Sequence, residues 1–197
     1  MMSWYGDVSP AIAHQEVTKN WLQLLTLLSE GGSQGLPDSA SLGDCNWAGD
    51  TENVPKGLAT AWLSWNAALL ERVFDVIGQS ESADDARQLG AGAASAYAKY
   101  VNDSGKVSSG SQMTQALALW FGLIRDEEVA QLAALLLEEQ IDAAANHVHG
   151  GIFTMKAIAT VAGRHVVLRP QTFTRRRFTR LASLFAELVS VLKELRL

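Results

Sequence analysis

Residues 58–77 read LATAWLSWNAALLERVFDVI, and this stretch decides the fold class. Its large apolar side chains recur at steps of about three to five positions, which is the spacing of one face of an α-helix and not the alternation of a strand. The pattern predicts a helix from about residue 54 to residue 77, ended by Gly78. The residues expected on its apolar face are Leu58, Trp62, Trp65, Leu69, Val73, Phe74 and Ile77.

Helical periodicity continues on both sides of this stretch. Upstream, Ser9 as the N-cap and Pro10 as the first helical residue predict a helix that runs to Leu28 and ends at the glycine pair 31–32. Downstream, helices are predicted over residues 83–101, 112–123, 127–145 and 152–162, the last ended by Gly163. No strand-like alternation of any length occurs, so we expect an all-α fold of antiparallel helical hairpins. The apolar face of the first helix is expected to hold Ile12, Val17, Trp21, Leu24, Leu25 and Leu28.

Composition limits the classes of protein that this chain can represent. It has 197 residues, of which 48% are hydrophobic and 19% charged, which is enough for one domain with a sizeable core. A single cysteine, Cys45, allows neither an internal disulfide nor a cysteine zinc site. No stretch reaches the roughly 20 consecutive apolar residues of a membrane span, and the first residues do not resemble a signal peptide. The sequence therefore predicts a soluble domain without a membrane span.

Charge divides the chain into two parts. Residues 1–163 hold 8 Lys and Arg against 19 Asp and Glu, a net −11, whereas residues 164–197 hold 8 against 2, a net +6. The acidic body argues against nucleic acid as a partner. We therefore expect a helical domain over 1–163 and a divergent basic tail over 164–197.

The basic tail has two alternative roles. Arg175, Arg176 and Arg177 precede a run of apolar residues, from Leu181 to Leu195, at helical three- and four-residue steps. A basic cluster ahead of an amphipathic helix is able to bind a partner or an anionic membrane surface. The alternative, which the abrupt change in composition favours, is a helix that covers other helices or a stretch without a selected function.

A long loop is expected between the first two helices. Residues 31–55 are rich in glycine, proline and other turn-forming residues, and they carry Asp44, Cys45, Trp47 and Asp50. Long loops in compact domains are often functional, so this loop is the first place to look for a binding site.

Several short motifs occur in a particular order along the chain. Tyr5-Gly6-Asp7 comes first and Leu42-Gly43-Asp44 lies in the long loop, before the helix that begins near Gly57. The other motifs are 112–119 (QMTQALAL), 121–123 (FGL), His147 with 151–153 (GIF), and 162–164 (AGR). This order and spacing resemble the six-hairpin glycosidase domain of bacterial and fungal α-L-rhamnosidases, over about residues 4–164.

The resemblance implies both a fold and a reaction. In that family the helices form an α/α toroid whose loops line a sugar pocket, and a terminal α-L-rhamnoside is hydrolysed with inversion. A complete toroid has twelve helices, and this chain supplies about six, so we expect half a ring. Inversion requires two carboxyl groups and no cofactor. The family's acid lies upstream of the Tyr5 motif and its base in a Trp-Glu segment downstream of Arg164, and neither is found here. No catalytic residue is assigned, and the chain alone is expected to be inactive.

Two residues of the long loop are candidate sugar contacts. The Asp44 motif aligns with a Gly-Asp-Trp loop of the family whose tryptophan is a platform for the sugar, but Cys45 stands in the place of that tryptophan. Trp47 is able to replace it, because an indole face stacks on the apolar side of a pyranose, and Asp44 is able to accept a sugar hydroxyl. The alternative is that Trp47 is a loop aromatic packed on the helices.

Other polar and aromatic residues are better explained by structure than by binding. Trp62 and Trp65 are favoured as core residues over a ligand platform, and Gln112, Thr114 and Gln115 as hydrogen-bonding residues of a helix start. His147 and His149 have no third ligand at a suitable spacing, so no metal site is expected, and His14 is expected at the surface. The function implied is that of a rhamnosidase-like hydrolase fragment acting on a rhamnose-containing carbohydrate. The alternative is a noncatalytic helical module for interaction or carbohydrate binding.

Overall fold

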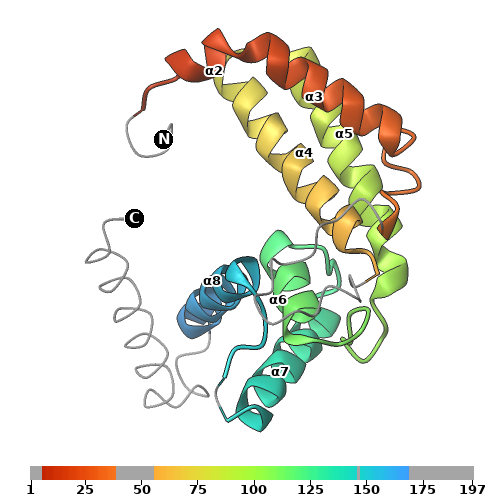
Figure 1. Cartoon of the computed structure of the whole chain (residues 1–197), viewed down its shortest axis with the longest axis vertical. Coiled ribbons are helices and arrows are strands. Elements are labelled where there is room, and N and C mark those ends of the chain that lie inside the picture. The colour runs from red at the N-terminus through yellow and green to blue at the C-terminus, as the bar shows by residue number, and fades with distance from the viewer. Residues whose placement is uncertain (1–5, 39–55, 146, 169–197) are drawn as a thin grey trace. The chain divides into compact units, whose positions relative to one another are not determined.

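The computed structural model describes residues 6–38, 56–145 and 147–168, with side chains as far as residue 161 (Figure 1). The chain consists of two compact units, Met1–Ile158 and Ala159–Leu197. The candidate sugar contacts Asp44 and Trp47 and almost the whole basic tail lie outside the described residues.

The predicted all-α fold is confirmed. The described residues form the α-helices α2 (Ser9–Ala13), α3 (Gln15–Leu28), α4 (Leu58–Val76), α5 (Ser80–Tyr97), α6 (Gln112–Phe121), α7 (Glu127–Ala143) and α8 (Ile152–Leu168) and the short 3-10 helix η2 (Ala98–Tyr100). The only extended pairing among these residues is an isolated bridge between Val101 and Val107. Helix α3 contacts both α4 and α5, α4 also contacts α6, and α6 pairs with α7. Within the part of the chain that the structure describes, no helix has the length and apolarity needed to cross a membrane.

The first predicted helix is in fact two helices, α2 (Ser9–Ala13) and α3 (Gln15–Leu28), separated at His14. Ser9 is a residue of α2 and not its cap, and Val8 occupies the cap position. Asp7 Oδ1 accepts hydrogen bonds from the backbone N–H and the hydroxyl of Ser9, at 2.9 and 2.7 Å. The bond from the Ser9 hydroxyl, followed by that from its N–H, lowers the pKa of Asp7. The predicted capping by Ser9 is wrong, because the cap position of α2 makes no side-chain hydrogen bond.

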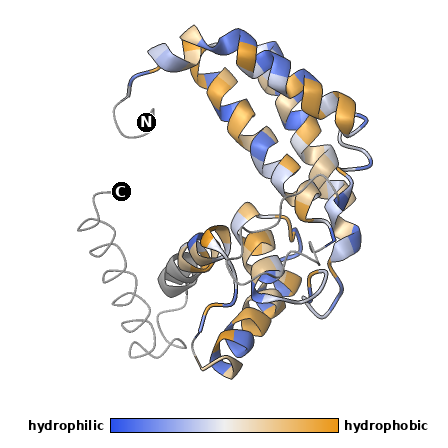
Figure 2. Ribbon diagram, in the orientation of Figure 1, coloured by the Kyte–Doolittle hydropathy of each residue, from blue (hydrophilic) through white to orange (hydrophobic). Residues whose placement is uncertain are grey.

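The apolar face predicted for this helix is largely wrong. Leu22 and Leu25 are the buried apolar residues of α3 and join the core with α4 and α5. Of the six predicted core positions only Leu25 is buried, and orange and blue mix along the α3 ribbon in Figure 2. The other predicted residues remain partly or largely exposed: Ile12, Val17, Trp21, Leu24 and Leu28.

Helices α4 (Leu58–Val76) and α5 (Ser80–Tyr97) form the central hairpin, which turns at Gly78 as predicted. Small residues on α5 allow the two helices to approach closely: an added Cβ on Gly90 would lie 3.3 Å from the Cβ of Ala67. Arg87 pairs with Glu71 across the hairpin at 2.8 Å. The core of α3, α4 and α5 consists of Leu22, Leu25, Leu63, Ala67, Leu70, Phe74, Ala83, Ala86, Leu89 and Ala93.

Helices α6 (Gln112–Phe121) and α7 (Glu127–Ala143) form a second hairpin, and Gly122 ends α6 in the left-handed conformation. The acidic start predicted for the next helix is confirmed, because Asp126 caps α7 by accepting from the N–H of Val129 at 3.0 Å. Helix α8 (Ile152–Leu168) continues through Gly163. The predicted end of this helix at Gly163 is therefore wrong.

Candidate functional site

Two contacts join the start of α4 to the chain that precedes the long loop. Thr60 Oγ1 accepts a hydrogen bond from the N–H of Leu36 at 3.1 Å and donates to its carbonyl oxygen at 3.2 Å. Asp38 Oδ1 accepts from the N–H of Gly57 at 2.7 Å. We call the residues Leu36, Asp38, Gly57 and Thr60 the loop clamp.

The loop clamp depends on two glycines. Gly35 and Gly57 both have positive φ, at +71° and +82°, which residues with a Cβ rarely adopt. A Cβ on Gly35 would collide with Thr60, and a Cβ on Gly57 would collide with the ring of Tyr100. The residues on either side of the segment 39–55, which carries Asp44 and Trp47, are thus held at the first turn of α4.

Polar side chains in the first turn of α6 bind the backbone of two further loops. The Gln115 side chain is fully buried; its Oε1 accepts from Val107 N–H at 2.6 Å, and its Nε2 donates to the carbonyls of Gly105 and Ala133 at 2.9 and 3.2 Å. Thr114 Oγ1 donates to the carbonyl of Val107 at 2.9 Å. These side chains therefore fix the loop that precedes α6.

Gln112 does the same for the loop that precedes α8. Its Nε2 donates to the carbonyls of Gln140 and His147, at 3.3 and 3.1 Å, and its Oε1 accepts from the N–H of His149 at 2.8 Å.

The sequence predicted that Gln112, Thr114 and Gln115 serve the helix start itself. Thr114 does so, because its Oγ1 donates to the carbonyl of Ser111 at 3.1 Å. The cap of α6 is Ser111, however, and the amides of Gln112 and Gln115 bind the backbone of loops and of α7 instead.

The two histidines take part through their backbones. Both imidazoles are exposed, while His147 C=O and His149 N–H bind Gln112. No group of three potential ligands suited to a metal ion occurs among the residues that the structure describes.

An aromatic cluster joins α4 to the end of α6 and the start of α8. It consists of Trp62, Trp65, Trp120, Phe121 and Phe153. Trp62 makes edge contacts with Phe121 and Phe153, at centroid distances of 5.0 and 4.9 Å, and Trp65 stacks on Phe121 at 4.9 Å. This packing agrees with the prediction that Trp62 and Trp65 belong to the core, although both remain half-buried.

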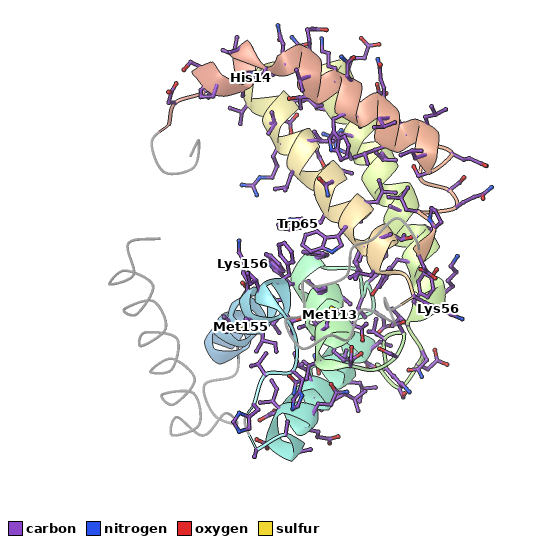
Figure 3. The ribbon with its side chains drawn as sticks, in the orientation of Figure 1. His14, Lys56, Trp65, Met113, Met155 and Lys156 are labelled. Carbon is purple, nitrogen blue, oxygen red and sulfur yellow. The ribbon has the colours of Figure 1, made fainter. Side chains whose placement is uncertain are left out.

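One cation lies beside the aromatic cluster. The Nζ atom of Lys156 is 5.5 Å from the centroid of the Trp120 ring, within the range of a cation–π contact. Trp65 and Lys156 extend from α4 and α8 into the same region (Figure 3). The cluster thus combines an apolar surface with one positive charge.

Sequence reasoning missed several of these residues. Asp38, Thr60 and Gln140, whose side-chain amide donates to the carbonyl of Gly110, all anchor loop backbone. No usable sequence signal was present for Thr60, because it lies opposite the apolar face predicted for its helix, yet the structure buries it.

The chain is similar to known proteins in sequence pattern and in fold. The family model described as the bacterial alpha-L-rhamnosidase 6 hairpin glycosidase domain matches residues 1–169. The structure of alpha-L-rhamnosidase from Dictyoglumus thermophilum superposes with a TM-score of 0.70 at 20% identity, covering 82% of this chain and 19% of that one. No curated protein sequence matches the chain.

A second solved structure gives the same result. The alpha-L-rhamnosidase of Streptomyces avermitilis, complexed with L-rhamnose, superposes with a TM-score of 0.65 at 23% identity, covering 81% of this chain and 15% of that one. The chain thus spans less than a fifth of the length of either structure. Since the family model covers most of the chain and both structures share its helical fold, the chain belongs to the family of bacterial alpha-L-rhamnosidase six-hairpin glycosidase domains.

Proposed function

We propose that this chain recognises a terminal α-L-rhamnose unit as one wall of an α-L-rhamnosidase-like sugar pocket. Membership of the six-hairpin family supports a carbohydrate substrate, as does the L-rhamnose bound in the Streptomyces avermitilis relative. We also propose that residues 1–163 form the helical domain and that residues 164–197 form a separate basic tail.

The proposed sugar contacts are Asp44 and Trp47. The carboxylate of Asp44 accepts a hydrogen bond from a sugar hydroxyl, and the indole of Trp47 stacks on the apolar face of the pyranose. The assignment of these two residues follows from the family resemblance. The loop clamp supports the proposal that they act at one place: the hydrogen bond from Gly57 to Asp38 and the pair between Thr60 and Leu36 fix the chain on both sides of the segment that holds them.

The proposed reaction of the complete pocket is inverting hydrolysis. Such a reaction needs a protonated carboxyl group to donate to the leaving oxygen and an ionised one to activate water, about 6.5–9.5 Å apart. No residue of this chain is assigned to either role. We therefore expect binding without turnover, since general acid–base catalysis typically contributes about 10²–10⁴-fold.

A noncatalytic carbohydrate-binding or interaction module is the second candidate. The observation that favours it is the use of the polar residues at the start of α6: Gln112, Thr114 and Gln115 all bind loop backbone. Side chains engaged in this way hold a scaffold together and are not available to a substrate.

An assay with an aryl α-L-rhamnoside tests the proposal. The purified chain and its Asp44→Asn variant are incubated with the glycoside, and release of the aryl alcohol is followed by absorbance. The expected result is no release above the buffer control from either protein. Turnover that disappears in Asp44→Asn would instead make Asp44 a catalytic residue and contradict the assignment.

A further inference from the structure

A groove of about 480 Å³ lies between α3 and α5, two helices that contact each other side by side (Figure 1). We call it the α3–α5 groove. Of the described residues, those that line it belong to α3, to α5 and to the turn after α3, and none belongs to the loop clamp or the aromatic cluster. Its volume is within the range of about 300–1,000 Å³ that is typical of ligand sites. The groove is therefore large enough for a small molecule.

Close backbone contact sets one end of the groove. A Cβ on Gly32 would lie 2.7 Å from the carbonyl oxygen of Leu89, so the turn after α3 touches the backbone of α5. The groove begins next to this contact, at Gly31, and extends along α3 to Lys19. Because a helix rises about 1.5 Å per residue, the stretch from Lys19 to Leu27 is about 12 Å long. The groove is therefore elongated along the two helices.

The floor of the groove is apolar and fixed. Leu22 and Leu89 line the groove and also belong to the core that α3, α4 and α5 share, where they are 5% and 2% exposed. Leu27 lines the groove as well, but it is not a member of that core and is 76% exposed. A ligand with an apolar face therefore gains contact with Leu27 beside a floor that the core already holds in place.

Polar side chains border this apolar surface on both helices. Gln23 lies on the α3 side, and Ser82, Asp85 and Gln88 follow one another at steps of three residues on the α5 side. None of these four side chains forms a hydrogen bond with another described residue. Amide and hydroxyl groups both donate and accept hydrogen bonds, and a carboxylate accepts them. The borders of the groove therefore offer donors and acceptors to a ligand.

The two charged residues of the groove have opposite signs. Lys19 lies on α3 and Asp85 on α5, so the groove has no net charge. The Lys19 ammonium also has a partner outside the groove, because its Nζ lies 3.6 Å from Oε1 of Glu16. A ligand with a net charge is attracted by one of the two groups and repelled by the other. The groove therefore favours a neutral ligand.

From these observations we infer that the α3–α5 groove is a second carbohydrate-binding site, which takes a neutral disaccharide. A sugar ring presents an apolar C–H face, which packs on Leu27, and a rim of hydroxyl groups that donate and accept hydrogen bonds. Gln23 on one border and Asp85 and Gln88 on the other bind this rim. The site is independent of the sugar contacts proposed at Asp44 and Trp47.

A titration followed at side-chain amide signals by NMR tests this inference. The ¹⁵N-labelled chain is titrated with α-L-rhamnopyranosyl-(1→6)-D-glucose, a neutral disaccharide, and separately with glycerol, a polyol without a ring. We expect saturable shifts of the Gln23 and Gln88 amide signals in the millimolar range with the disaccharide and none with glycerol. Gln34, exposed outside the groove, is expected not to shift. No tryptophan is found among the described residues that line the groove, so these signals are read apart from the indole of Trp47.

Three variants separate the groove from other sites. Gln88→Ala removes one border group, and the affinity read at the Gln23 signal is expected to fall by about five- to tenfold. Gln34→Ala, the matched control, and Trp47→Ala are expected to leave that affinity unchanged. Any of three results would overturn the inference: no saturable shift of the Gln23 and Gln88 signals, an unchanged affinity in Gln88→Ala, or a loss of the response in Trp47→Ala.

Discussion

The Oδ1 atom of Asp38 accepts a hydrogen bond from the backbone N–H of Gly57 at 2.7 Å, although the two residues are 19 positions apart in the chain. Because Gly57 is buried at the start of α4, its N–H has poor access to water and needs this partner. The contact therefore joins the residues that precede and follow the segment 39–55.

Removing the acceptor at position 38 should loosen this closure. Asp38→Ala leaves the buried N–H of Gly57 without a partner, and we expect the free energy of unfolding to fall by about 1–2 kcal/mol. Asp38→Asn keeps an acceptor oxygen and should retain most of the parent chain's free energy of unfolding. Urea denaturation of both variants provides the measurement, and equal losses in the two would show that the hydrogen bond is not what stabilises the segment.

The side chain of Gln115 should be among the most sensitive polar groups in the protein. Gln115→Leu conserves the approximate volume but strands the N–H of Val107 and two carbonyl oxygens, so we expect a loss of about 2–5 kcal/mol in the free energy of unfolding. The control is Gln88→Leu at an exposed position of α5, which should change stability by less than about 0.5 kcal/mol. A small effect of Gln115→Leu in chemical denaturation would mean that the loop before α6 does not depend on this amide.

The aromatic cluster should contribute to stability through Trp62. Trp62→Ala removes ring contacts with Phe121 and Phe153, and we expect a loss of about 2–4 kcal/mol, less than for a fully buried tryptophan. Trp62→Phe keeps an aromatic ring and should recover a large part of that loss. If the thermal midpoint of Trp62→Ala equals that of the parent chain, Trp62 is not a core residue.

Tyr97 should make the protein sensitive to alkaline pH. Burial, followed by the proximity of Tyr100, raises the pKa of the Tyr97 phenol in the folded state. A raised pKa means that the folded protein holds this proton more tightly than the unfolded chain, so stability should fall as the pH rises above about 10, where an unfolded tyrosine ionises. Tyr97→Phe should remove that part of the fall. Thermal midpoints measured across this pH range, with Tyr100→Phe as the comparison, provide the test.

The hairpins could be predicted from sequence, because their signals are local. The apolar period of 58–77, Gly78 after it and the acids before α7 each fix a helix through the residues next to it. Gly163 failed as a stop signal, since glycine weakens a helix by only about 1 kcal/mol and α8 continues through it.

Properties that depend on distant residues could not be predicted in the same way. The choice between the two apolar sides of α3 is made by α4 and α5, so the periodicity alone did not reveal that Leu22 is buried and Trp21 is exposed. The partners of Gln112 lie 28 to 37 positions away, so only the folded chain reveals its role as an anchor for the loop before α8. The assignment of Asp44 and Trp47 rests on a family resemblance and remains a prediction.

The most direct test of rhamnose recognition is a titration followed at the indole N–H signals of the six tryptophans by NMR. L-rhamnose is added to the ¹⁵N-labelled chain, with L-fucose, another 6-deoxyhexose, as the control sugar. With one wall of the pocket, affinity should lie in the millimolar range, about −4 kcal/mol. We expect a saturable shift of the Trp47 signal with L-rhamnose that is weaker with L-fucose and is lost in Trp47→Ala. No shift at any accessible sugar concentration, or a saturable shift of other signals that persists in Trp47→Ala, would contradict it.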